Sequence, residues 1–164
     1  MWKELISSQT DAAQFVAPAS HQQIAALESA LKTPLPADLA DLLCESNGVV
    51  INYYLDEDAR VECDVDENDI DKFNLHVAWS TERIERENLR IRKEPDLKTL
   101  YMPFGHLLFF SDAANGDLFA YAILDGVVRN DDIYVWSHED DSRRWIARSL
   151  ETYIEGWLNG SLKW

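Results

Sequence analysis

The chain has 164 residues, of which 46% are hydrophobic, and thirty acidic against fifteen basic residues give it a formal charge of −15. This composition excludes a wholly disordered chain, and the charge disfavours phosphate backbones and anionic lipid surfaces as partners. We therefore expect one domain over residues 1–164, without a cofactor, that binds neither nucleic acid nor membranes and favours a cationic protein partner.

The sequence contains no sign of export or of a membrane span. No apolar run approaches the roughly eighteen residues that a span requires, and the N-terminus lacks the basic and apolar regions of a secretory signal. Two cysteines, Cys44 and Cys63, are too few for a disulfide framework, and no histidine pattern accompanies them. These features predict a cytoplasmic protein with free thiols and no metal site.

Helices are expected first in the chain. Apolar spacing predicts a short helix over 2–6, followed by a polar connection through 15–18. Ser20 and Gln23 are spaced as a capping box and open a longer helix, and Pro36 starts another. Helices therefore precede the first strand.

The next segment is predicted to pass from helix to strand. Asn47-Gly48 is typical of the left-handed stop at a helix end. The run 49–55 is rich in β-branched and aromatic residues, which favours a strand. The chain then enters its most charged stretch.

Residues Asp56 to Asp71 form the strongest charge feature, with nine acids against one base. Apolar residues alternate with polar ones around Cys63, which favours an edge strand with outward acidic side chains. The strand before it ends in two tyrosines that could anchor a partner, one of which should face the core because strand side chains alternate. The predicted partner-binding residues are Tyr53, Tyr54, Asp56, Glu57, Asp58, Asp64, Asp66, Glu67, Asp69 and Asp71.

The second half of the chain is predicted to hold a helix, a meander and a closing helix. The first helix covers about 82–90, with Ser80 or Thr81 as its cap, and a polar loop follows over 92–96. Apolar runs within 104–138 are broken by Asn-Gly and Asp-Gly pairs, which indicates a meander of at least three antiparallel strands.

The remaining residues are expected to form a loop and a helix. Both charge signs occur over 137–145, which favours a loop. Apolar residues then recur at helical spacing over 150–158.

The sequence disfavours both a calcium site and a hydrolase active site. Asp64 to Asp69 resembles the opening of a calcium loop, but Asp69 stands where a glycine is needed and Leu75 where a bidentate glutamate is needed. Ser137 and His138 are directly adjacent and lie in no glycine-flanked nucleophile elbow, so a hydrolase is disfavoured.

Further acidic clusters stand outside the main acidic run. Asp131-Asp132 and residues 139–141 each predict a solvated loop when taken alone. Together with the 56–71 run they could form one negative face.

Several motifs, in order, resemble those of the SUKH superfamily, which groups bacterial immunity proteins with the fungal Smi/Knr cell-wall regulators. The motifs are the Trp2 segment, Ile24 to Leu31, Leu35-Pro36-Ala37-Asp38-Leu39, Leu42-Leu43 leading to Asn47-Gly48, Asn115-Gly116-Asp117, Val135 to Glu139, and Ser149-Leu150 into Tyr153-Ile154 and Trp157-Leu158. The resemblance implies a single α+β domain with helices packed on a curved, largely antiparallel sheet. It is weakest over 56–100, where partner specificity is expected to diverge.

The resemblance and the charge lead to one functional hypothesis. The resemblance implies a bacterial immunity protein, and the acidic surface favours a cationic toxin domain such as a nuclease as its partner. The protein is then no enzyme and neutralises the toxin by binding it. The alternative is a regulatory scaffold of the Smi/Knr type that recruits a cellular enzyme.

Overall fold

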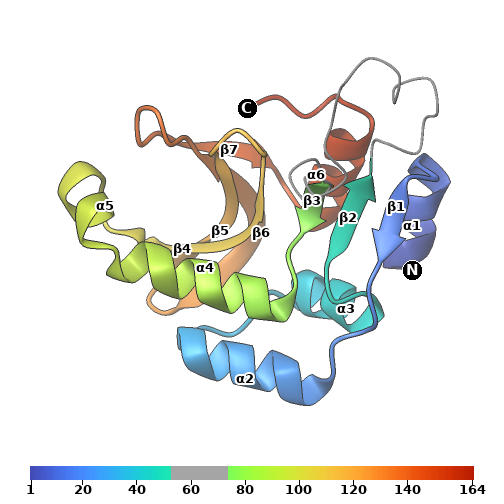
Figure 1. The fold of residues 1–164 in the computed structure, drawn as a ribbon, viewed down its shortest axis with the longest axis horizontal. Helices are drawn as coiled ribbons and strands as arrows, with labels where there is room; N and C mark the ends of the chain where they lie inside the picture. The colour runs from blue at the N-terminus through green and yellow to red at the C-terminus, as the bar shows by residue number, and fades with distance from the viewer. Residues whose placement is uncertain (53–73) are drawn as a thin grey trace, which may run out of the picture.

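The computed structural model describes residues 1–52 and 74–164 and has a mixed α+β fold (Figure 1). Helices pack against two antiparallel sheets, of which the C-terminal one is strongly curved. The expected fold class is therefore confirmed, and the antiparallel strands are divided between two sheets.

The N-terminal segment forms helices around a short strand. Its elements are α1 (Trp2–Gln9), β1 (Ala13–Phe15), α2 (His21–Leu31) and α3 (Ala37–Glu45). The predicted capping box is present, because the Ser20 hydroxyl accepts from the Gln23 amide and the Gln23 side chain accepts from the Ser20 amide. The polar connection predicted over 15–18 is partly wrong, since Phe15 ends β1.

The first sheet has the strand order β1-β2-β3, with β2 over Val49–Asn52 and β3 over Asn74–Ala78. Helix α3 ends before the predicted stop, because Ser46 is already extended. Gly48 has a φ of +104°, and a Cβ there would lie 3.1 Å from the Ser80 amide nitrogen. Asn47 instead caps the next helix, since its Oδ1 accepts from the Thr81 amide at 2.8 Å.

Helix α4 (Thr81–Lys93) is capped by Ser80, whose hydroxyl accepts from the Arg83 amide. The polar loop predicted over 92–96 is wrong, because α4 continues to Lys93 and α5 (Pro95–Leu100) starts one residue later. Proline at the first helical position suits a helix start, since its missing N–H would lack an intrahelical partner in any case.

The second sheet has the strand order β4-β5-β6-β7. After a 3-10 turn, η4 (Phe104–His106), the strands are β4 (Leu107–Asp112), β5 (Leu118–Leu124), β6 (Val127–Trp136) and β7 (Arg143–Ala147), and α6 (Leu150–Leu158) closes the chain. The predicted meander is confirmed. The loop predicted over 137–145 is partly wrong, because β7 begins at Arg143 and pairs with β6.

The core runs through both sheets and under the helices. Its largest fully buried side chains include Trp79, Tyr121, Tyr153 and Phe110. The two sheets are joined where the Trp79 amide donates to the Phe110 carbonyl at 2.8 Å. This junction fixes β3, the strand that follows the acidic segment, against the C-terminal half.

Candidate partner-binding site

All ten predicted partner-binding residues fall within 53–73, outside the described residues. They are Tyr53, Tyr54, Asp56, Glu57, Asp58, Asp64, Asp66, Glu67, Asp69 and Asp71. The predicted edge strand around Cys63 lies in the same range. Asn52 ends β2, Asn74 begins β3, and the two are register partners. The acidic segment therefore starts and finishes at the same point of the first sheet.

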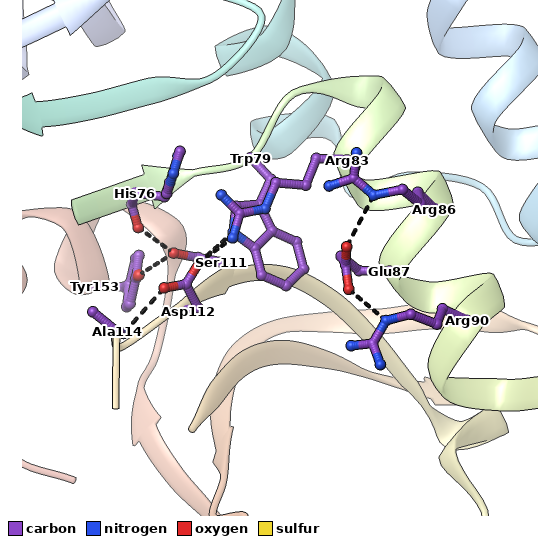
Figure 2. A network of polar contacts seen from close by, with 10 residues as sticks. All are labelled: His76, Trp79, Arg83, Arg86, Glu87, Arg90, Ser111, Asp112, Ala114 and Tyr153. Carbon is purple, nitrogen blue, oxygen red and sulfur yellow. Dashed lines mark hydrogen bonds and ion pairs between the residues drawn. The ribbon is translucent and has the colours of Figure 1, made fainter. Parts of the chain in front are cut away.

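A polar network joins Trp79 and the start of α4 to the end of β4 (Figure 2). The Asp112 carboxylate accepts from the Trp79 indole at 2.6 Å and from the Arg83 guanidinium at 2.9 Å. That guanidinium also lies over the Trp79 ring, 4.9 Å from its centroid. The start of α4 is thereby fixed to the end of β4.

A second part of the network fixes β3 itself. The Ser111 hydroxyl donates to the His76 carbonyl at 2.6 Å, and it accepts from the Tyr153 hydroxyl at 3.1 Å (Figure 2). Burial raises the pKa of the Tyr153 hydroxyl far above its usual range, so it remains a donor at physiological pH. Sequence reasoning missed this contact because the three residues are far apart in the chain.

Acidic side chains on separate elements of the described surface lie close enough for their charges to act on Asp38. Burial raises the pKa of Asp38, and the charges of Asp131, Asp41 and Glu151 raise it further. Asp131 belongs to a predicted acidic cluster, whereas its proximity to the first turns of α3 and α6 was not predicted. The acidic character of the chain therefore extends to residues outside 53–73.

The predicted cluster at 139–141 is not wholly a solvated loop. Burial opposes ionisation of Asp141, but hydrogen bonds from the Met102 amide and the Trp136 indole, with Arg143 alongside, bring its pKa below the usual value. Asp141 therefore fastens the β6–β7 loop to the segment before β4. It is not available as part of one continuous negative face.

The Asp117 and His138 side chains form a contact that resembles part of a catalytic triad. His138 Nδ1 lies 2.8 Å from Asp117 Oδ1, which also accepts from the His138 amide at 3.1 Å. The neighbouring Ser137 is buried, and its hydroxyl accepts from the Glu139 amide at 3.4 Å. The geometry joins two loops, and the serine is not placed as a nucleophile toward the histidine.

Gly116 is required at this junction for two reasons. Its φ is +106°, a backbone conformation that residues with a side chain rarely adopt. A Cβ there would also lie 2.9 Å from His138 Nδ1. The Asn-Gly-Asp and Ser-His-Glu motifs are thus two halves of one structural contact.

This contact predicts a specific pH dependence. Burial would raise the pKa of Asp117, but hydrogen bonds from His138 and Asn115 outweigh it and hold the pKa below its ordinary value of 3.8. A lowered pKa stabilises the fold above the ordinary value, and that contribution is lost as the pH falls toward the folded value. We expect Asp117→Asn to be destabilising at pH 7, with a difference from wild type that shrinks toward pH 3, measured by urea unfolding.

The exposed Glu139→Gln variant is the matched control, because it removes one acidic charge from the same loop region. If the Asp117→Asn difference stays constant from pH 7 to pH 3, the carboxylate does not contribute through its ionisation.

The described residues contain no group of three or more histidine, cysteine or carboxylate side chains placed to hold a metal ion. Among them, no helix is both long and apolar enough to cross a membrane. The histidine–carboxylate pair of Asp117 and His138 joins two loops.

The chain belongs to the SMI1/KNR4 family (SUKH-1), whose family model matches residues 18–156. The predicted family resemblance is confirmed, although the Trp2 segment and Trp157-Leu158 lie outside the matched residues. The family is known for immunity proteins of polymorphic toxin systems, which are generally non-catalytic. A search of curated protein sequences gave no significant match.

Proposed function

We propose that this protein is a non-enzymatic immunity protein that binds and neutralises a cationic toxin domain in the cytoplasm. The observation that carries the proposal is the run of nine acids from Asp56 to Asp71 in a member of a family known for immunity proteins. A nuclease is the toxin activity that best matches this charge, because such an enzyme needs a basic surface for its substrate.

The charge of the chain supports this partner in physical terms. A formal charge of −15 creates a long-range field that attracts a basic surface and speeds diffusional encounter. The cluster around Asp38, Asp131 and Glu151 adds to that field from the described surface. Steering by charge affects mainly the association rate and its dependence on salt.

The acids and tyrosines of the segment are proposed to play different roles. The carboxylates from Asp56 to Asp71 pair with lysine and arginine side chains of the toxin. One of Tyr53 and Tyr54 supplies an aromatic anchor at the centre of the contact, where buried aromatic groups contribute most to affinity. Loss of the anchor is expected to speed dissociation, whereas loss of the acids is expected to slow association.

An affinity capture tests the proposed function directly. The full chain is immobilised, incubated with lysate of its native cell and eluted by stepwise increases in salt, and the eluates are identified by mass spectrometry. We expect one basic polypeptide to be released as salt rises, because screening weakens contacts between exposed charges.

The matched control is a bait in which the acids of the 56–71 run are replaced by their amides. Recovery of the same polypeptide by both baits at every salt step contradicts the role of the acidic run. Recovery of cellular synthesis or signalling enzymes, with no basic partner, favours the regulatory scaffold instead.

A further inference from the structure

A pocket of about 410 Å³ opens beside α5. Helix α5 lies at the opposite end of the long axis of the molecule from α1 (Figure 1). This volume is within the range of sites that bind small groups or inserted side chains. Its lining residues are Ile91, Arg92, Lys98, Tyr101, Met102, Pro103, Phe104 and Gly105. They come from the end of α4, from α5 and from the segment leading into β4.

The charge of the pocket is opposite to that of the chain. Arg92 and Lys98 are its two charged lining residues, and both are cationic in a protein of formal charge −15. Neither has an ion-pair partner within the described part of the chain. An anionic group would therefore find two cations that are not already neutralised there.

Arg92 is half-buried and only partly satisfied. Its Nη2 donates to the Leu107 carbonyl at 2.9 Å, whereas its buried Nε has no hydrogen-bond partner among the described residues. Burial lowers the pKa of this guanidinium, but arginine remains protonated at neutral pH. The guanidinium therefore keeps its positive charge at the pocket, where a carboxylate would be its charge partner.

The wall of the pocket is held in place by the β6–β7 loop. The Tyr101 hydroxyl donates to the His138 carbonyl at 2.8 Å, and the Met102 amide donates to the Asp141 carboxylate at 2.8 Å. Arg143 then donates to the Met102 carbonyl at 2.8 Å. A site held in this way loses little conformational freedom when it is filled.

The rim of the pocket is apolar and exposed. Leu100 is 71% exposed and Met102 is 55% exposed, so apolar surface continues beyond the pocket itself. Gly105 also leaves the pocket open, since a Cβ there would meet no atom within 4 Å. An occupant that covers both pocket and rim must be longer than a small molecule, which favours a polypeptide.

We propose that this pocket binds a peptide segment of a protein partner in which a large apolar side chain stands next to a glutamate or aspartate. The apolar side chain enters between Ile91, Met102 and Phe104. The neighbouring carboxylate pairs with the Arg92 guanidinium and with the Lys98 ammonium group. The residues that line this surface lie outside 53–73, and the proposal does not depend on the proposed toxin.

The test is a titration of the isotopically labelled full chain, followed by NMR of its backbone amides. The probes are four acetylated and amidated heptapeptides with the pattern Ser-Gly-Glu-X-Glu-Gly-Ser, in which X is leucine, isoleucine, phenylalanine or tryptophan, together with the same four peptides carrying glutamine for glutamate. We expect saturable shifts at Lys98, Tyr101, Met102 and Gly105 with at least one glutamate peptide. Its glutamine counterpart should bind at least about tenfold more weakly, because the charged hydrogen bonds are lost.

Variants locate the binding in the pocket. Gly105→Phe fills the space that the glycine leaves, and Lys98→Glu reverses one cation on an exposed residue; both should weaken binding at least about tenfold. Lys93→Glu is the matched control, since Lys93 is an exposed cation just before α5 that does not line the pocket, and it should leave binding nearly unchanged.

Three results would each overturn the proposal. They are the absence of saturable shifts with all glutamate peptides, equal binding of the glutamine peptides, and shifts with octanoate but with no peptide, which would identify a site for a small carboxylic acid. No toxin takes part in this titration, so its failure leaves the proposed function standing. Conversely, an empty toxin capture leaves the peptide result standing.

Discussion

Replacing Asp64, Asp66, Asp69 and Asp71 together by asparagine is expected to slow association with the proposed toxin domain by about tenfold or more at low salt. The four carboxylates belong to the densest run of charge in the chain, and electrostatic steering acts on the rate of encounter. The dependence of the association rate on ionic strength should also flatten, because fewer charges remain to be screened. Surface-bound toxin and a series of salt concentrations provide the measurement.

The control for this variant carries the same change in net charge at other exposed positions. The control replacements are Asp11→Asn, Asp96→Asn, Asp125→Asn and Glu139→Gln. Equal slowing in both variants would assign the effect to net charge alone. Unchanged association and affinity in the first variant would show that the acidic run is not the contact surface.

Features encoded over a few neighbouring residues could be predicted from the sequence. The capping box at Ser20 is present, and Ser149 caps α6 by accepting from the Thr152 amide. The turn at Asp125-Gly126 has positive φ at both residues, as the hairpin between β5 and β6 requires. Local chemistry decides each of these, so no knowledge of distant contacts is needed.

Strand β7 and helix α5 were not predicted, because their local sequence signals are weak. Strand β7 carries two arginines and the exposed Trp145, a composition typical of an edge strand that must resist further pairing. Its pairing with β6 decides its structure, and the charge pattern of 137–145 indicates only a polar segment. The short helix α5 has one usable signal, the proline at its first position, and a proline also suits a polar loop.

The long-range contacts of the candidate sites could not be predicted from the sequence. The junction of Asp117 with His138 and the convergence of Arg92, Tyr101 and Met102 on one pocket depend on how α4, α5 and two loops pack together. The spacing of residues along the sequence carries no information on such long-range contacts. The ten predicted acidic and aromatic contact residues stay a prediction, because they lie outside the described residues.

The free edge of β4 is covered by side chains of α4. Asn88 is fully buried; its Oδ1 accepts from the Phe109 amide at 3.0 Å and its Nδ2 donates to the Phe109 carbonyl at 2.7 Å. One helical turn later, Arg92 bonds the Leu107 carbonyl. The two side chains thus satisfy backbone groups of an edge strand that would otherwise be left without partners or pair with another chain.

Replacing Asn88 by leucine, a residue of similar size, is therefore expected to lower the free energy of unfolding by about 3 kcal/mol. The change leaves the Phe109 amide and carbonyl buried without hydrogen-bond partners. Each buried group without a partner costs about 1–3 kcal/mol. Urea unfolding at pH 7 measures the loss. The matched control is Arg86→Leu on the exposed face of α4, which should change the free energy by no more than about 0.5 kcal/mol. A loss below about 1 kcal/mol for Asn88→Leu would show that β4 finds other partners and that α4 does not hold its edge.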